Sequence, residues 1–152
     1  MLLDFLRDGE NMNYMKAACD LAEKAMQNDE VPVGCVIVDK GKIVGCGYNK
    51  KETSKIAICH AEIMAIVDAC KYKDSWRLDD CEMYITLSPC MMCMGAIMES
   101  RIGKVYYLLD STFHTNKCFS FDDLKNVEKY NDKALEDKYS EMLSNFFKNR
   151  RK

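Results

Sequence analysis

Apolar residues near the start of the chain predict an amphipathic helix. From Tyr14 to Met26 they recur three and four positions apart with polar residues between them, which is the spacing of one helix face. Asn28-Asp29-Glu30 breaks this pattern and should end the helix. Residues 1–11 show no clear period, so we interpret them as an N-terminal extension of uncertain status ahead of one domain over residues 12–152.

A β-hairpin is predicted next. The chain from Val31 to Val38 is almost wholly apolar and rich in β-branched residues, Asp39-Lys40-Gly41-Lys42 has the composition of a turn, and the apolar pattern resumes from Ile43 to Tyr48. Asn49 would end the second strand, and we interpret the polar segment 50–55 as a loop.

The middle of the chain predicts strands joined through a helix. A helix is expected from His60 to about Lys73, a strand from Met83 to Leu87, a second helix from Cys90, and a strand from Lys104 to Leu109. A strand, helix and strand in this order form a right-handed crossover between parallel neighbours. The fold class is therefore α/β, and a ligand site is expected at the carboxyl end of the first of these two strands.

Weaker patterns follow Asp110. They predict an irregular stretch to Ser120, a short element over residues 121–124, a strand over residues 127–130, and a final helix from about Lys133.

The composition is that of a single globular domain. Of 152 residues, 48% are apolar and 30% charged, which is enough to build one core. No window approaches the roughly eighteen uninterrupted apolar residues of a membrane span, and the charged N-terminus has no signal-peptide pattern. We therefore expect a cytoplasmic protein with no membrane contact. Nine cysteines scattered among apolar segments suit reduced core residues better than disulfides.

The charge balance limits any contact with nucleic acid. With a net charge of -2, the chain has no broad basic footprint, so contact with RNA would depend on a small basic patch. The basic C-terminal residues 148–152 are a candidate for contacts with phosphates. They are equally well interpreted as a solvated tail.

Candidate metal ligands stand in two separate motifs. His60 and Glu62 form a His-x-Glu motif, and Cys90 and Cys93 form a Cys-x-x-Cys motif. One His with a Cys-x-x-Cys pair is a spacing that binds zinc. Three protein ligands leave the fourth tetrahedral position open to water, as in catalytic zinc sites. The ion would lower the pKa of that water to about 7, and Glu62 would carry its proton.

This chemistry requires both motifs to lie at the start of a helix. Residues at i and i+2 do not share a helix face, so His60 and Glu62 can both reach one metal only where His60 is not yet helical. Pro89 similarly favours a helix start just before Cys90. The positive ends of two helices would then converge on the metal and favour thiolates.

Alternatives remain open at several of these positions. The cysteines could instead belong to a structural zinc site whose fourth ligand is Cys59, Cys118 or His114. His114 is also compatible with an ordinary exposed histidine, and Asn49 with a turn residue. The methionines of the Cys90 helix are expected to pack in the core rather than to form a recognition surface; they are Met91, Met92, Met94 and Met98.

From about Glu30 to its end, the chain resembles the bacterial tRNA-specific adenosine deaminases, which convert adenosine to inosine at the wobble position of the anticodon. The resemblance includes both metal motifs and extends to other segments. These are Glu30-Val31-Pro32-Val33-Gly34, Gly47-Tyr48-Asn49, Trp76-Arg77-Leu78, Tyr84-Ile85-Thr86-Leu87, Ser100-Arg101-Ile102-Gly103-Lys104-Val105 and Leu143-Ser144-Asn145-Phe146-Phe147-Lys148.

The resemblance implies a three-layer α/β/α sandwich with a central mixed five-stranded sheet, of the cytidine deaminase-like type. It also implies a homodimer, one Zn²⁺ per subunit, and the tRNA anticodon arm as substrate. In this family pattern His60, Cys90 and Cys93 bind zinc, Glu62 is the proton shuttle, and Asn49 reads the edge of the base. The flipped base would rest against Val31 and His60, with Ala61 and Pro89 bounding the pocket and Asp110 as a further substrate-binding residue.

The sequence also departs from that family. Ser88 stands where the family usually has Glu, and residues 112–120 replace the family's usual pattern in a region that helps to grip the anticodon loop. Deaminases of free cytosine with the same fold also have Ser at this position. A second hypothesis is therefore a deaminase of a free base or nucleoside, such as cytosine, guanine or a modified purine. A third hypothesis is a non-enzymatic partner subunit. The presence of Glu62 speaks against it, because a purely structural site has no use for this carboxylate.

Overall fold

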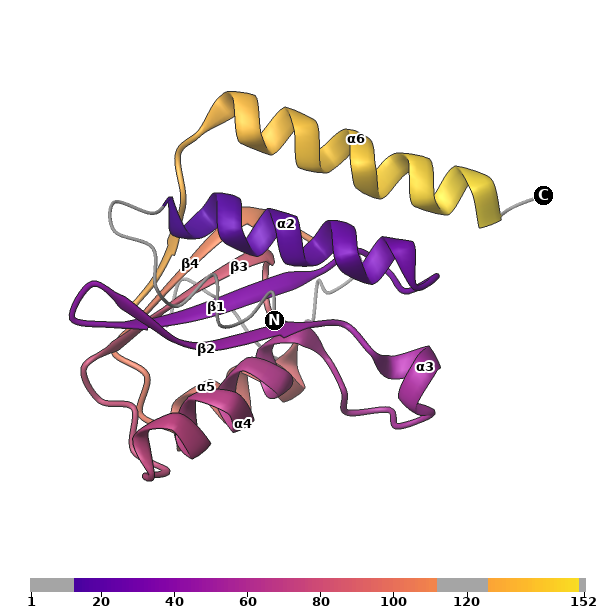
Figure 1. The fold of residues 1–152 in the computed structure, drawn as a ribbon. Helices are drawn as coiled ribbons and strands as arrows, with labels where there is room; N and C mark the ends of the chain where they lie inside the picture. The colour runs from indigo at the N-terminus through magenta and orange to yellow at the C-terminus, as the bar shows by residue number, and fades with distance from the viewer. Residues whose placement is uncertain (1–12, 112–125, 151–152) are drawn as a thin grey trace.

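In the computed structural model, which describes residues 13–111 and 126–150, a mixed sheet lies between two layers of helices (Figure 1). The sheet has five strands in the order β2-β1-β3-β4-β5. The strands are β1 (Gly34–Asp39), β2 (Lys42–Tyr48), β3 (Cys81–Leu87), β4 (Lys104–Leu109) and β5 (Val127–Lys129).

The strand directions confirm the predicted connections. β1 pairs antiparallel with both β2 and β3, whereas β3, β4 and β5 run parallel to one another. The first two strands are therefore the predicted hairpin, and β3 and β4 are the predicted parallel pair joined by a helix. The carboxyl ends of β3 and β4 consequently meet at the same edge of the sheet.

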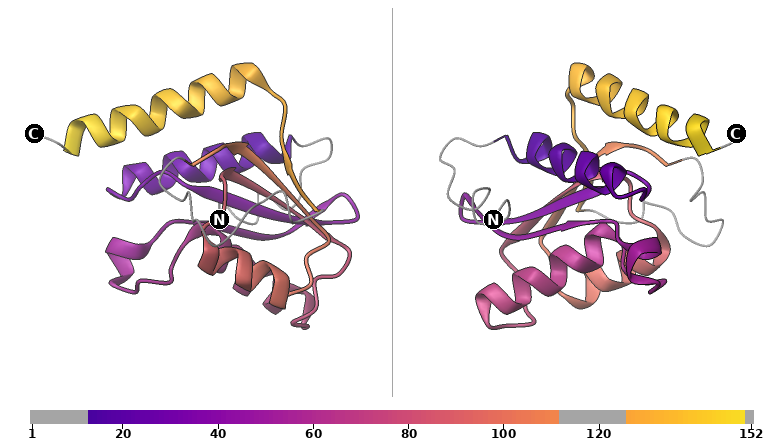
Figure 2. Two further views of the ribbon diagram at one scale, coloured as in Figure 1. Left: turned by 180° about the vertical axis from the view of Figure 1, so that it is seen from behind. Right: turned by 45° about the vertical axis from the view of Figure 1, so that its right-hand side comes forward.

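Helices cover both faces of the sheet, which confirms the expected three-layer fold. Figures 1 and 2 show α2 and α6 on one face, and α4 and α5 on the other. The helices are α2 (Tyr14–Gln27), α3 (Lys51–Ser54), α4 (Ala61–Lys73), α5 (Met91–Glu99) and α6 (Lys133–Arg150). Within the described ranges, no helix is both long and apolar enough to cross a membrane.

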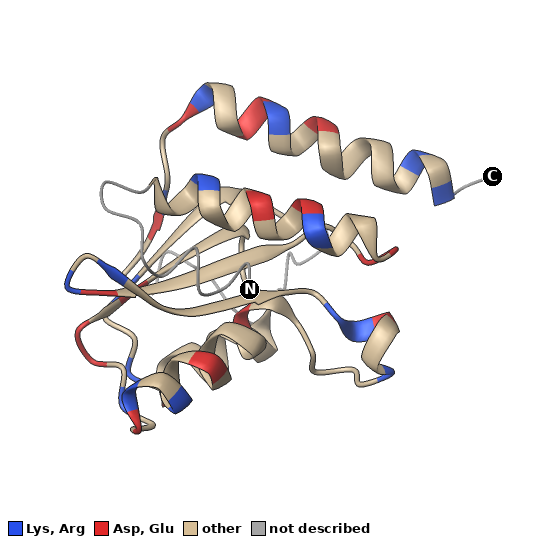
Figure 3. Ribbon diagram, in the orientation of Figure 1, with Lys and Arg blue, Asp and Glu red and all other residues tan. Residues whose placement is uncertain are grey.

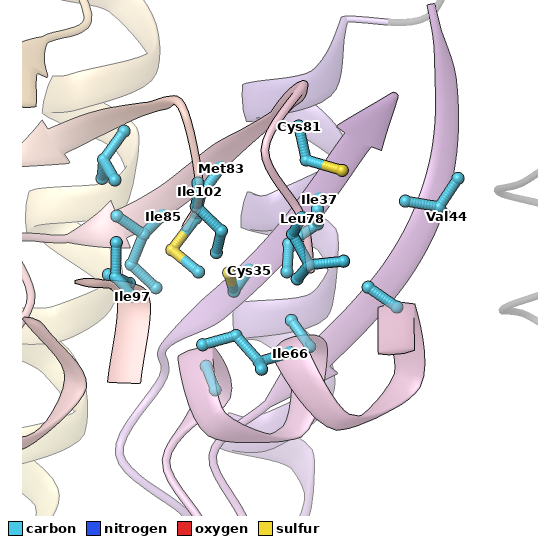
Figure 4. Packing of buried hydrophobic residues seen from close by; sticks show 14 of the residues in the cluster. Cys35, Ile37, Val44, Ile66, Leu78, Cys81, Met83, Ile85, Ile97 and Ile102 are labelled. Carbon is cyan, nitrogen blue, oxygen red and sulfur yellow. The ribbon is translucent and has the colours of Figure 1, made fainter. Parts of the chain in front are cut away.

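The core follows the two-residue alternation of the strands. In β1, Cys35 and Ile37 face α4 and α5, whereas Val36 and Val38 belong to the cluster that packs against α2. Figure 4 shows the first of these clusters between the sheet and the helices below it. Because both faces of the hairpin are covered, the apolar residues of β1 from Gly34 to Val38 are buried.

Two glycines allow α4 to lie directly against β2. A Cβ at Gly47 would lie 2.3 Å from the backbone oxygen of Ala61, and one at Gly45 would lie 2.5 Å from that of Ala65. Neither backbone oxygen can move without shifting the helix, so a larger residue would push α4 outward. This close approach sets the position of the first turn of α4 relative to the sheet.

Three expectations differ from the structure. The first strand begins at Gly34 rather than Val31, and Pro32 in between has no N–H to offer a strand ladder. The segment 50–55 contains the short helix α3 rather than only a loop. Met91 and Met98 are each 56% exposed and Met92 is exposed as well, so only Met94 of the four methionines packs in the core.

Some predictions concern residues outside the described ranges. They are the N-terminal extension 1–11, most of the irregular stretch that includes His114 and Cys118, the short element 121–124, and the last two residues of the basic C-terminus.

Candidate metal and base-binding site

His60 and Cys90 occupy equivalent positions at the starts of two helices. Each is the N-cap residue of its helix, His60 of α4 and Cys90 of α5, with extended backbone and no side-chain capping bond. An N-cap side chain normally bonds to the free N–H groups of the first turn. Here both side chains are free of that role and point toward each other, as the sequence predicted for a site between two helix N-termini.

The three candidate ligands have the spacing that zinc requires. Nδ1 of His60 lies 3.7 Å from Sγ of Cys90 and 3.6 Å from Sγ of Cys93. Tetrahedral zinc with its usual bonds to sulfur and nitrogen separates these atoms by about 3.6 Å. All three ligand atoms lie within 4.8 Å of one another, and His60, Cys90 and Cys93 are the one such group within residues 13–111 and 126–150. The residues therefore fit a zinc ion.

Of the two thiols, Cys90 carries a negative charge and Cys93 keeps its proton. The hydrogen bond from Cys93, helped by the bond from His60, lowers the pKa of Cys90 to about 3 against the effect of burial. The same bond raises the pKa of Cys93, as does burial. His60 in turn has a raised pKa because of its bond with Cys90. Cys90 is therefore a thiolate at neutral pH, which is the form that binds a metal.

Glu62 is a buried carboxyl group beside these ligands. Its residue is only 4% exposed, and burial raises its pKa from 4.5 to about 7, although its own backbone N–H and the Cys93 thiol favour the charged form. A carboxyl group that titrates near neutral pH can both accept and donate a proton under working conditions.

A cavity of about 220 Å³ opens beside these groups. Asn49 enters it from the end of β2, where its Nδ2 donates to the Val31 oxygen (3.3 Å) and its Oδ1 accepts from the Lys51 N–H (3.1 Å). A carboxamide has two N–H groups and two oxygen lone pairs, so one of each is left for a ligand. Val31, Val33, Asn49, Lys51, His60, Ala61, Glu62, Leu87, Ser88 and Cys90 line the cavity.

Residues 9–109 match the family described as the cytidine and deoxycytidylate deaminase zinc-binding region. The chain belongs to this deaminase family. The match includes both metal motifs, so the family and the geometry of the three ligands both point to zinc as the cofactor.

Relatives of this deaminase are named as tRNA-modifying enzymes. The chain is 39% identical over 147 residues to the tRNA-specific adenosine deaminase of Bacillus subtilis (strain 168), covering 91% of this chain and 89% of that protein. It is 47% identical over 98 residues to the tRNA-specific adenosine deaminase of Streptococcus pyogenes serotype M18, where the match covers 64% of this chain and only 62% of that protein.

Two solved structures share its fold. One comes from studies of A-to-I editing by tRNA:A34 deaminases at the wobble position of transfer RNA; it is 29% identical, with a TM-score of 0.72, over 80% of this chain and all of that chain. The other is a guanine deaminase from Bacillus subtilis, 37% identical with a TM-score of 0.64, over 68% of this chain and 67% of that one.

Only some of the predicted base contacts line the cavity of the deaminase. Val31, Asn49 and Ala61 line the cavity, whereas Pro89 and Asp110 are not among its lining residues. Pro89 is buried directly before Cys90, and Oδ1 of Asp110 accepts from the hydroxyl of Ser88 at 3.2 Å. Direct contact of these residues with a base stays a prediction.

Sequence reasoning missed part of the cavity wall. Val33, Lys51 and Leu87 were not predicted, and Ser88 was noted only as a departure from the family. The structure shows that Ser88 joins two strand ends, because its hydroxyl donates to Asp110 and accepts from the Ser111 N–H at 2.8 Å. The position of Ser88 just after β3 was the one available signal, since ligand sites form at such strand ends.

The buried Glu62 predicts a stability that depends on pH in the zinc-free protein. The folded state holds the Glu62 proton up to a pKa of about 7, against 4.5 for an ordinary Glu. Stability is therefore lost as pH rises from 4.5 through 7. Glu62→Gln removes this loss, so the zinc-free variant should exceed the zinc-free wild type by about 3 kcal/mol at pH 8 and match it near pH 4.

Urea unfolding of both zinc-free proteins across this pH range measures the effect. The exposed Glu99 of α5 supplies the control, since Glu99→Gln should leave the pH profile of the wild type unchanged. Parallel profiles for wild type and Glu62→Gln would show that the Glu62 carboxyl does not titrate abnormally.

Proposed function

We propose that this deaminase converts adenosine at the wobble position of tRNA to inosine in the cytoplasm. The observation that carries the proposal is the arrangement in one cavity of the His60, Cys90 and Cys93 group, the buried Glu62 and the half-satisfied Asn49 amide. The names of its relatives and the solved A34 deaminase structure support the choice of adenosine in tRNA.

Each residue of the site has a role in such a hydrolysis. Zinc held by His60, Cys90 and Cys93 would supply an activated water molecule for attack on the carbon that bears the amino group. Glu62 accepts the first proton of the water and delivers it to the neighbouring ring nitrogen. It then takes the proton of the added hydroxyl group and passes it to the amine, so that ammonia leaves and a carbonyl group remains. The remaining N–H and lone pair of Asn49 orient the edge of the base.

The size of the cavity is suited to a single base that has left the base stack of the RNA. A cavity of about 220 Å³ accommodates one base rather than a strand, so the adenosine must be flipped out of the anticodon loop. Lys51, the first residue of α3, lines this cavity, and α3 lies at the same end of the molecule as the basic end of α6 (Figure 3). These cations are suited to the flanking phosphates, which gives the otherwise acidic chain a local RNA contact.

A tRNA with adenosine at the wobble position tests the proposal directly. Incubation with the zinc-loaded protein should convert that position to inosine, which sequencing reads as guanosine, and the same tRNA with guanosine there should be unchanged. Unmodified adenosine, beside a tRNA adenosine deaminase of known activity as positive control, would contradict the proposal.

A free base is the second candidate substrate. The likeness to a solved guanine deaminase over two thirds of both chains and the Ser88 departure both favour it. Ammonia release from free guanine, cytosine and adenosine distinguishes the candidates, because the tRNA proposal expects release only from the tRNA. Release from a free base at a rate above that from tRNA would replace the first proposal with the second.

We also propose that a second copy of the chain covers the exposed face of α5. Met91 and Met98 are each 56% exposed, and Gly95 between them has no atom within 4 Å of a built Cβ. These positions are four and three residues apart and therefore form one apolar stripe along the helix. Such a stripe next to the Cys90 end of α5 suits a homodimer whose interface lies beside the site.

The stripe predicts that a charge at Met98 weakens the dimer. Met98→Glu places a carboxylate within the apolar contact, where its burial without a partner costs several kcal/mol. Sedimentation velocity should show a dimer for the wild type and a monomer at the same concentration for the variant. The exposed Ala134 of α6 lies in the other helix layer, so Ala134→Glu should remain dimeric. A dimeric Met98→Glu variant would exclude this interface.

A further inference from the structure

Glu30 is a fully buried acidic residue outside the metal group. It follows the end of α2, and its residue has 0% exposure. Its Oε1 accepts from the backbone N–H of Glu52 at 2.9 Å, and its Oε2 accepts from the backbone N–H of Thr53 at 2.7 Å and from the Thr53 hydroxyl. A buried carboxylate is tolerated only when such donors replace its water, and all of these donors belong to α3.

These contacts replace the missing cap of α3. The N-cap residue of this helix, Lys50, makes no side-chain capping bond, so the first N–H groups of the helix need an acceptor from elsewhere. Glu30 supplies it from a position more than twenty residues earlier in the chain. The four residues of α3 are too few to form a stable helix alone, so their conformation depends on this carboxylate.

Asn49 is connected to both sides of the Glu30 contact. Its side chain donates to the oxygen of Val31, the residue after Glu30, and accepts from the N–H of Lys51, the first residue of α3. Its backbone N–H also donates to the Val33 oxygen at 3.1 Å. The orientation of the Asn49 amide in the cavity is therefore determined by two segments that Glu30 holds together.

We propose that Glu30 is a positioning residue for the base-binding amide of Asn49. By joining the 30–33 segment to α3, it fixes the direction in which the free N–H and lone pair of Asn49 point. The inference rests on the proposed function, because it assumes that a base occupies the cavity beside Asn49. It assigns to substrate recognition a residue that touches neither the cavity nor the metal group.

The charge of Glu30 is needed for this role. Burial raises the pKa of Glu30, but the bonds from Thr53 and from the Glu52 N–H lower it more, so the pKa lies below its ordinary value and the group is a carboxylate at neutral pH. A glutamine of the same shape has only one acceptor oxygen. Its NH₂ group would face at least one backbone N–H of α3, so one buried donor would lose its partner.

Glu30→Gln is the variant that tests the role. We expect the amides of residues 51–54 to exchange with solvent about tenfold faster than in the wild type. Zinc content should stay at one ion per chain. The value of kcat/KM for wobble adenosine should fall about tenfold, which is within the range of coupling between residues in one hydrogen-bond network.

A double-mutant cycle with Asn49→Ala separates positioning from general structural support. If Glu30 acts through Asn49, Glu30→Gln should reduce kcat/KM much less in the Asn49→Ala background than in the wild type. A purely structural role would give the same reduction in both backgrounds. Glu52→Gln is the matched control on α3, because the exposed Glu52 side chain contributes only its unchanged backbone N–H to the contact.

Each result decides the inference. Equal reductions in both backgrounds, or unchanged exchange of the α3 amides, would overturn it. If Glu30→Gln fails to fold, Thr53→Val can replace it, because this variant removes only the hydroxyl donor. It should give the same faster amide exchange of α3 and the same fall in kcat/KM, each to a smaller extent. A wild type that forms no inosine at the wobble position would contradict the proposed function. The exchange measurement would still test whether Glu30 holds α3 in place.

Discussion

Glu62→Gln is expected to lower kcat for deamination by about 10²–10⁴-fold, which is the usual contribution of a positioned proton carrier. The glutamine keeps the shape of the side chain but can neither accept the proton of the attacking water nor deliver one to the departing amine. The KM should change little, because the Asn49 amide and the apolar walls of the cavity are left in place. Steady-state kinetics on wobble-adenosine tRNA measure both constants.

Zinc analysis shows whether this loss is chemical or structural. Glu62 is not one of the three ligand residues, so the variant should retain one zinc ion per chain and the circular dichroism spectrum of the wild type. Glu141→Gln on the exposed side of α6 should keep full activity. A Glu62→Gln variant that keeps the kcat of the wild type would remove Glu62 from the mechanism.

The metal site was predictable because local patterns determine its geometry. The apolar run that begins after His60 and the proline before Cys90 indicated two helix starts, and the structure has α4 and α5 beginning at those residues. The strand patterns on either side of α5 then required a parallel pair, which places the start of α5 at the carboxyl end of β3. Sequence motifs and element boundaries were therefore sufficient to bring the three candidate ligands together.

Longer-range contacts were not predictable in the same way. The segment 30–34 resembles the family, but no local pattern indicates what Glu30 binds, because its partners lie on α3 and α3 itself has no apolar pattern. The methionines show the opposite failure. Their apolar character indicated burial, but the helical period does not say whether an apolar stripe meets the sheet, as Met94 does, or remains exposed, as Met98 does.

Cys93→Ala is expected to abolish zinc retention and with it all measurable deamination. Cys93 is fully buried and its Sγ is one of only two sulfur ligands in the group. Losing a partner in the outer shell of a metal site already costs about 10–100-fold in affinity or activity, so loss of a ligand should cost more. Zinc content after dialysis and inosine formation measure the two effects. Cys70→Ala at the half-buried Cys70 is the control, and it should retain both zinc and deamination.

Cys93→Ala also tests, without an activity assay, whether Cys93 lowers the pKa of Cys90. In the zinc-free protein, the Cys93 thiol is the largest cause of the low pKa of Cys90, which is about 3. Without that hydrogen bond the pKa of Cys90 must rise toward the ordinary value of a thiol, although the bond from His60 and the start of α5 still favour the thiolate. Ultraviolet absorbance of the thiolate should therefore disappear at a higher pH in zinc-free Cys93→Ala than in the zinc-free wild type as both are acidified. An unchanged titration would mean that the two sulfurs do not share a proton, and the pairing that prepares Cys90 to bind zinc would have to be rejected.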